Sequence, residues 1–210
     1  MKPILFNTEM VRAILEGRKT VTRRVVKFMQ GKNPNWTGYV KDGLTLYNGT
    51  NEPCNIPAPY KVNDILYVRE TWSWYYTRSM KKQYIYRATN ENISGGQKWK
   101  PSLHMPKEAA RIFLRVTDVR VERLKDITNE QILAEGVDKK QIENYLGQMP
   151  DPQDEWTRER YVFEWSYIWD KTIKKDQYHH YSWSANPYVW VIEFERITQE
   201  QAEGKAAAVL

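Results

Sequence analysis

The alternation of hydrophobic and polar residues is longest in residues 110–124, ARIFLRVTDVRVERL. Ile112, Leu114 and Val116 would face one side of an extended strand, and the residues between them would face the other side. No other part of the chain alternates over so many residues. We therefore expect this run to be the central strand of a sheet.

Shorter patterns predict further strands. Residues 64–76 and 83–88 alternate well enough to pair, and the turn-like TRSMKK between them predicts a hairpin. The apolar PILFN near the start, the β-branched residues of 20–26 and the closing PYVWVIEFERI at 187–197 are also typical of strands.

Hydrophobic residues also recur at helical spacing. Thr8 offers an N-cap for a helix in EMVRAILEG, and Gly17 would end it. Thr128 would cap a short helix in NEQILAEGV that Gly136 closes. Residues 154–173 predict a long helix whose large side chains form a buried stripe. The stripe consists of Trp156, Tyr161, Trp165, Ile168 and Trp169.

The order of these elements indicates the fold class. Strands outnumber helices and do not alternate with them, which argues against a doubly wound parallel sheet. We expect an α+β protein built on a small mixed β-barrel with peripheral helices. Residues 29–60 contain Asn-Pro, Asp-Gly and Asn-Gly pairs and predict hairpins and loops.

Composition narrows the class of protein. The 210 residues are 41% hydrophobic and 28% charged, as in a soluble globular domain. No apolar run approaches the roughly 18 residues of a membrane span, and the N-terminus has no signal-peptide pattern. We therefore expect a cytoplasmic protein without a membrane partner.

The supply of metal ligands is small. Cys54 is the only cysteine, and the three histidines, His104, His179 and His180, have no zinc-site spacing. The sequence therefore predicts no internal disulfide, no metal and no cofactor. The net charge of +6 suits an anionic partner but also simple solubility, and the nine tryptophans suit either a core or base stacking.

The segment GRKTVTRR, residues 17–24, carries the candidate chemistry. A lysine amine can take the proton of a threonine hydroxyl and so activate it as a nucleophile. In a regular strand Lys19 and Thr22 would point to opposite faces, whereas Thr20, Thr22 and Arg24 would share one. Lys19 can join Thr22 only if the corner after Gly17 is irregular.

The neighbouring arginines support this interpretation. Arg18, Arg23 and Arg24 would lower the pKa of Lys19, and burial would lower it further, toward the neutral amine that a general base requires. The alternative is a solvated, basic end of a strand with ordinary β-forming threonines.

At this point a family resemblance adds to the residue pattern. The segments GRKTVTRR, DILYVRETW, DITNEQILAEGV and PYVWVIEFERI resemble an ASCH domain, a member of the PUA-like barrel family, in its longer phage and bacterial form. The matches cover residues 3–30, 61–74, 111–137 and 187–197. The resemblance implies one PUA-like domain over residues 1–198. It also implies insertions near 29–60, 75–108 and 139–185, before a flexible tail at 199–210.

One branch of that family is similar to N4-acetylcytidine amidohydrolases, which need no metal. The resemblance places the catalytic lysine at Lys19, the nucleophilic threonine at Thr22 and the catalytic acid at Glu135, with a ligand-facing arginine at Arg24. Lys19 would deprotonate Thr22, and Thr22 would attack the acyl carbonyl of an N4-acylated cytosine. Glu135 would protonate the leaving amine and later activate water. Direct attack by water, with Thr22 orienting the substrate, stays open.

Further substrate contacts are expected from the LYVRETW segment. Arg69, Glu70 and Trp72 would lead toward the rim of the site, where Glu70 pairs with Arg24 or reads the base and an aromatic ring stacks on it. The alternatives are a structural ion pair for Glu70 and core packing for Trp72. Relatives carry Gly-Asp where this chain has Asn63-Asp64, and we expect Asn63 to keep the left-handed turn.

Two other functions compete with the amidohydrolase. The first is an ASCH module that binds RNA, with or without cleaving it, through a patch that extends from Arg23 and Arg24. The patch would also contain Arg115, Arg120, Arg123 and Lys125. The second is a phage accessory protein without catalysis. Lys19, Thr22 and Glu135 together favour the enzyme, with a nucleoside or nucleobase as its small-molecule substrate, because a clamp for RNA needs only positive charge.

Overall fold

The computed structural model describes residues 1–27, 39–41, 43–48, 50–54, 56–90, 92–93, 98–138 and 155–204. The chain divides into two compact units. The first unit comprises Met1–Arg18, Val62–Thr117 and Phe194–Leu210, and the second comprises Lys19–Lys61 and Asp118–Glu193.

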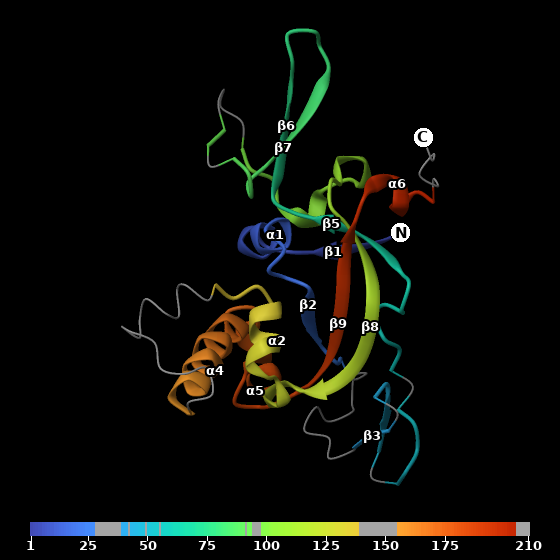
Figure 1. The fold of residues 1–210 in the computed structure, drawn as a ribbon, viewed down its shortest axis with the longest axis vertical. Coiled ribbons are helices and arrows are strands. Elements are labelled where there is room, and N and C mark those ends of the chain that lie inside the picture. Colours follow the sequence, from blue (N-terminus) through green and yellow to red (C-terminus); the bar gives the residue numbers. More distant parts are fainter. Residues whose placement is uncertain are drawn as a thin grey trace. The chain divides into compact units, whose positions relative to one another are not determined.

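The main sheet has five strands, and its mixed pairing confirms the α+β class. Strand β1 is parallel to β5, whereas β5 is antiparallel to β8 and β9 is antiparallel to β2 (Figure 1). In spatial order the strands are β1 (Lys2–Leu5), β5 (Ile65–Arg69), β8 (Phe113–Arg123), β9 (Tyr188–Ile197) and β2 (Val21–Val25).

The expected closed barrel is not present in the described part of the chain. A barrel closes only when its first and last strands pair. Here the strand order begins at β1 and ends at β2, so the sheet is open. The physical reason is that each of these short edge strands is described with a single neighbour, β5 for β1 and β9 for β2.

The central position of β8 is confirmed, since it is the third of five strands. Leu114 and Val116 are fully buried, whereas Thr117 is exposed, so the alternation of the sequence matches the two faces of the strand. Phe113 departs from this pattern because it is buried, against Tyr67 and a small apolar cluster.

The first unit adds helix α1 (Thr8–Leu15), helix α6 (Gln199–Ala202) and the hairpin of β6 (Trp72–Tyr76) and β7 (Lys82–Tyr86). Short 3-10 helices lie at Ser102–His104 and Lys107–Ala109. The hairpin was expected, and Figure 1 shows it extending from its unit. Asn63 has φ 70°, so the expected left-handed turn before β5 is confirmed. Helix α6 occupies the beginning of the segment that the sequence suggested to be a flexible tail.

The N-cap of α1 corrects the sequence prediction by one residue. The side chain of Asn7, in place of that of Thr8, accepts a hydrogen bond from the backbone N–H of Met10 at 2.8 Å. Asn7 is extended at φ −75° and ψ 171°, as an N-cap must be, and Thr8 is the first helical residue. Gly17 ends the helix region with φ 77°, as expected.

This difference predicts the effects of two adjacent substitutions. Asn7→Ala removes the cap and is expected to lower the free energy of unfolding by about 1 kcal/mol. Thr8→Ala is the matched control and should change it by less than about 0.5 kcal/mol, since alanine is a good helix former. Urea unfolding of both variants measures the difference. A larger loss for Thr8→Ala would place the cap at Thr8.

The second unit combines β2 with helices and a small hairpin. Its helices are α2 (Asn129–Ala134), α4 (Glu155–Asp170) and α5 (Tyr178–Tyr181), with 3-10 helices at Leu124–Asp126 and Lys175–Gln177. Strands β3 (Tyr39–Lys41) and β4 (Thr45–Tyr47) pair within the region predicted to form hairpins. Thr128 caps α2 in a reciprocal capping box with Gln131, which confirms the predicted start of this helix.

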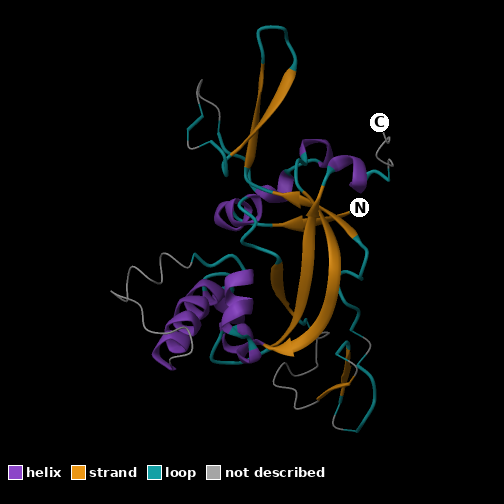
Figure 2. Cartoon of the chain, viewed as in Figure 1, coloured by secondary structure: helices purple, strands orange, loops and turns teal. Residues whose placement is uncertain are grey.

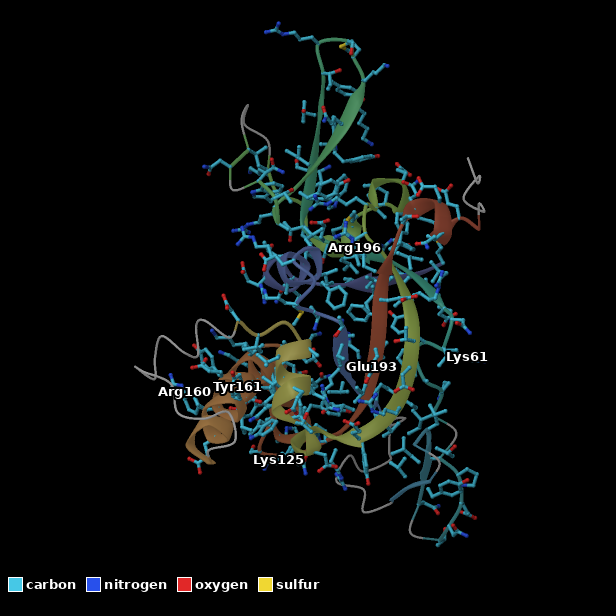
Figure 3. All side chains as sticks on the ribbon, viewed as in Figure 1. Lys61, Lys125, Arg160, Tyr161, Glu193 and Arg196 are labelled. Atoms are coloured by element: carbon cyan, nitrogen blue, oxygen red, sulfur yellow. The ribbon has the colours of Figure 1, made fainter. Side chains whose placement is uncertain are left out.

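The aromatic stripe of α4 forms the core of the second unit. Tyr161, Trp165 and Trp169 are 3–5% exposed and pack with Ile132 of α2 and Val191 of β9. Figure 2 shows α2 and α4 side by side, and Figure 3 labels Tyr161 on α4. Ile168 packs at the edge of this cluster, and the side chain of Trp156 lies outside the described residues. No helix in the described segments is long and apolar enough to span a membrane.

Candidate active site

The candidate site forms where the end of α2 meets the start of β2. Lys19 and Glu135 form an isolated antiparallel bridge, and the N–H of Thr20 donates to the carbonyl of Ala134 at 2.8 Å. Glu135 is the C-cap residue of α2. The irregular corner after Gly17 therefore directs Lys19 toward Glu135.

Lys19 is a fully buried lysine. Its Nζ donates to the Oε2 atom of Glu135 at 2.7 Å, to the Glu135 carbonyl at 2.8 Å and to the Val21 carbonyl at 2.7 Å. The Lys19 and Glu135 side chains are 0% and 1% exposed. Three acceptors match the three hydrogens of an ammonium group, so the resting state described here is a buried ion pair.

Arg23 holds the other oxygen of the same carboxylate. Its side chain is 0% exposed and donates to the Oε1 atom of Glu135 at 3.1 Å. The second guanidinium nitrogen donates to Gln131 at 2.8 Å and to Glu122 at 3.3 Å. Two cations thus meet two carboxylates, and this balance makes the burial of so many charges tolerable.

The pKa of Lys19 is lowered from its ordinary value of 10.5. Burial is the largest cause because it penalises the charged ammonium, and the charges of Arg24 and Arg23 act in the same direction. The carboxylate of Glu135 opposes the shift without reversing it. The site therefore brings a buried amine closer to its neutral form.

Thr22 and Arg24 form a second hydrogen-bonded pair. The Arg24 guanidinium donates to the Thr22 hydroxyl at 2.7 Å and to the Arg23 carbonyl at 2.9 Å. Thr22 is 1% exposed, and its contact with Arg24 confirms that residues two apart on β2 share a face. Since Arg24 donates, the Thr22 oxygen accepts and its own hydrogen is left to be donated to a base.

Electrostatics link the two pairs within the second unit. Burial lowers the pKa of Arg24, and the charge of Glu135 partly opposes that shift. The charge of Arg24 in turn contributes to lowering the pKa of Lys19. Glu135 therefore acts on both pairs: Lys19, Arg24 and Glu135 form one group of interacting charges, and Thr22 is hydrogen-bonded to Arg24.

Glu70 does not form the ion pair with Arg24 that the sequence suggested. Both of its oxygens accept from Arg111, at 2.8 Å and 3.0 Å, and its side chain is 1% exposed. Arg111 also stacks 4.0 Å above the ring of Tyr86 and donates to Thr89. Glu70 pairs with Arg111 in place of Arg24 because the two parallel hydrogen bonds use both of its carboxylate oxygens. This makes it part of a structural ion pair in the first unit.

The two other predicted rim residues also have structural partners in the first unit. Trp72 is 5% exposed and packs against Met105 and Ala109, so its ring belongs to a core cluster. Arg69 donates to the Leu103 carbonyl at 3.2 Å. A substrate contact for Arg69, Glu70 or Trp72 stays a prediction, and burial disfavours it for Trp72.

Several residues of the cluster were not identified from the sequence. Arg23 was expected only to add positive charge, and Gln131 and Glu122 were not expected at the site. The signal for Gln131 was available, since Thr128-x-x-Gln131 is a capping box that fixes this turn of α2. Glu122 lies 99 residues from Arg23 and has no local signal.

Among the arginines expected to bind RNA, Arg23, Arg115 and Arg120 are paired with acidic groups. Arg120 contacts Asp118, Glu122 and Glu193 at 2.5 Å each, and Figure 3 labels Glu193 on β9. Arg115 pairs with Glu195 at 2.9 Å. Arg123 stacks 3.8 Å above the ring of Tyr188. The compensated charges of Arg115 and Arg120 reduce the attraction of these two residues for phosphates.

Comparisons with known proteins give no family for the chain. No protein-family model matches the sequence, and neither a curated protein nor a solved structure matches it. Within the described segments, no three histidine, cysteine, aspartate or glutamate side chains gather as a metal site would require. The class that fold and site define is a mixed α+β protein with a buried lysine–glutamate pair beside a threonine–arginine pair.

Proposed function

We propose that the chain is a metal-free amidohydrolase that removes the acyl group from N4-acylated cytosine or cytidine, on an ASCH domain of PUA-like fold. The observation that carries the proposal is the buried Lys19–Glu135 pair at 2.7 Å. Apolar residues of similar volume often stabilise a protein as well as a buried ion pair does. Stability alone therefore gives little reason for the chain to have this pair. A buried lysine with a lowered pKa is a candidate for catalysis.

One proton transfer converts the resting pair into its working form. A proton moves from the Lys19 ammonium to the Glu135 carboxylate along their short hydrogen bond and leaves a neutral amine beside a carboxylic acid. Burial favours the neutral amine of Lys19, since it lowers the pKa of this group. The mechanism then requires the amine to turn its lone pair from its hydrogen-bond partners toward the hydroxyl of Thr22.

Acylation follows from these protonation states. Lys19 accepts the Thr22 proton, and the Thr22 oxygen attacks the acyl carbonyl while Arg24 stabilises the developing negative charge through its 2.7 Å hydrogen bond. The carbon–nitrogen bond breaks, and Glu135 protonates the exocyclic amine of cytosine. Lys19 is now an ammonium, Glu135 a carboxylate and Thr22 an acyl ester.

Deacylation restores the working pair. Glu135 takes a proton from water, and the hydroxide attacks the ester carbonyl. The Thr22 oxygen leaves and takes its proton back from Lys19. The carboxylic acid departs, with Lys19 neutral and Glu135 protonated as before.

The RNA-binding alternative has less support at the residues from which it was inferred. Two of its arginines, Arg120 and Arg115, are paired with carboxylates. An RNA clamp would also have no use for a buried lysine whose three donors point inward. The amidohydrolase uses both features.

The shared proton predicts a bell-shaped dependence of kcat/KM on pH. At low pH the pair carries a second proton and has no base to offer; at high pH the shared proton is lost, and no acid remains to protonate the leaving amine. Because the pKa of Lys19 is lowered from the ordinary lysine value of 10.5, kcat/KM should begin to decline on the alkaline side at a pH below 10.5. A rate that keeps rising beyond that pH would contradict the shared-proton mechanism.

Product analysis tests the function itself. The purified full chain is incubated with N4-acetylcytidine, with and without a strong chelator, and the products are separated by chromatography. We expect cytidine and acetate in equal amounts in both arms. Deamination to uridine, or turnover that a chelator abolishes and zinc restores, would rule out the proposed chemistry.

A further inference from the structure

The β6–β7 hairpin carries an aromatic ladder on one face. Residues two apart on a strand share a face, and cross-strand partners lie on the same side. Trp72 pairs with Tyr86, Trp74 with Tyr84, and Tyr76 with Lys82. One face therefore presents Trp72, Trp74, Tyr76, Lys82, Tyr84 and Tyr86.

The ammonium groups of two lysines lie close to these rings. The Lys82 ammonium lies 4.9 Å from the ring centre of Tyr84 and 5.5 Å from that of Trp74. Lys100, bridged to Trp72 through the backbone, lies 5.3 Å from the ring of Trp72 and 5.5 Å from that of Trp74. The face thus alternates flat rings with positive charge.

The outer part of the ladder is accessible. Trp72 at the base is 5% exposed and belongs to the core, whereas Tyr76 is 55% exposed. Trp74 and Tyr84 are half-buried, and Lys82 is exposed. Figure 1 shows the hairpin extending from its unit, and the exposed residues of the ladder lie toward its outer end.

The hairpin is one-sided in charge. Residues 71–90 contain four cations, Arg78, Lys81, Lys82 and Arg87, and no aspartate or glutamate. The carboxylate of Glu108 accepts from the Tyr84 hydroxyl at 3.1 Å and also acts on the charge of Lys82. The ladder therefore combines exposed rings with an excess of positive charge at its outer end.

We propose that this face binds single-stranded nucleic acid, with unpaired bases stacking on Trp74 and Tyr76 and phosphates contacting Lys82 and Arg78. Aromatic platforms with neighbouring cations are how sequence-tolerant single-strand binding is achieved, since every base has a flat π-face. The proposal is independent of the amidohydrolase chemistry and uses none of the arginines of the second unit.

The tip of the hairpin argues against a membrane as the partner. A segment that inserts into a bilayer interface presents apolar residues at its leading end. Here the tip, residues 77–81, is polar and cationic except for Met80. The rings lie along the side of the strands, where an extended chain of bases can follow them.

Adjacent tyrosines on opposite faces provide a matched test. Tyr76 lies on the ladder, whereas Tyr75 lies on the other face, where its hydroxyl donates to Gln83 at 2.7 Å. Fluorescence anisotropy measures binding of the full chain to labelled single-stranded RNA and DNA of about 12 nucleotides. Tyr76→Ala should weaken binding on the order of 5- to 100-fold, and Tyr75→Ala by less than about twofold.

Three further arms complete the test. Lys82→Gln should make the dependence of log Kd on log salt shallower by about 0.7, the value for one phosphate contact on a single strand. A duplex of the same sequence should bind more weakly, because its bases are already stacked. Equal losses for Tyr76→Ala and Tyr75→Ala, or binding to anionic lipid vesicles in place of oligonucleotides, would overturn the proposal.

Discussion

Thr22→Ala is expected to lower kcat for N4-acetylcytidine on the order of 10²–10⁴-fold while the chain stays folded. The substitution removes the hydroxyl that Arg24 holds at 2.7 Å and that Lys19 would deprotonate. Thr22 is buried, so a modest loss of stability is expected as well, and circular dichroism would establish that the fold is retained. Steady-state kinetics gives the size of the effect.

Two variants make this result specific. Thr22→Ser keeps a hydroxyl and should restore a measurable part of the turnover. Thr20→Ala removes a hydroxyl from an exposed position two residues away and should change kcat by less than about twofold. If Thr20→Ala proved the more damaging substitution, the nucleophile would be assigned two residues too late.

Glu135→Gln is expected to abolish most activity and to lower the free energy of unfolding by about 3–5 kcal/mol. Gln keeps the shape of the side chain but removes the charge that neutralises both Lys19 and Arg23, and both cations are 0% exposed. Urea unfolding measures the loss of stability. Activity must be assayed at low temperature, where the folded fraction is large enough to interpret.

Lys19→Met provides the comparison. It removes one cation but leaves Glu135 paired with Arg23, so no charge is stranded. The loss of stability should be smaller, about 1–3 kcal/mol, from acceptors that lose their donor. The loss of activity should match that of Glu135→Gln, because both residues act on one proton. Equal stability losses for the two variants would show that Arg23 does not share the carboxylate.

Local features of the fold could be predicted from the sequence. The alternation around Leu114 fixes both the strand β8 and its two faces, and the Thr128–Gln131 capping box starts α2. These signals lie within a few neighbouring residues. Whether the sheet closes into a barrel could not be predicted in this way, because closure depends on which strands lie at the edges. In the structure the edge strands are β1 and β2.

The candidate site shows the same division. The segment from Lys19 to Arg24 was identified because its chemistry is concentrated in a few residues. Glu135 came from the family resemblance, and its contact with Lys19 spans 116 positions. The partner of Glu70 is Arg111, 41 residues away, and no local pattern distinguishes it from the other arginines. Charge pairs between distant residues are set by the fold, so sequence reasoning could propose a partner for Glu70 but could not select it.

The most direct measurement of the central claim is the ultraviolet spectrum of N4-acetylcytidine during incubation with the wild-type chain, with Thr22→Ala in parallel. The account predicts that the spectrum shifts to that of cytidine with the wild type, at a rate proportional to enzyme concentration, and hardly shifts with the variant. An unchanged spectrum with the folded wild-type chain, or equal rates for the two proteins, would contradict it.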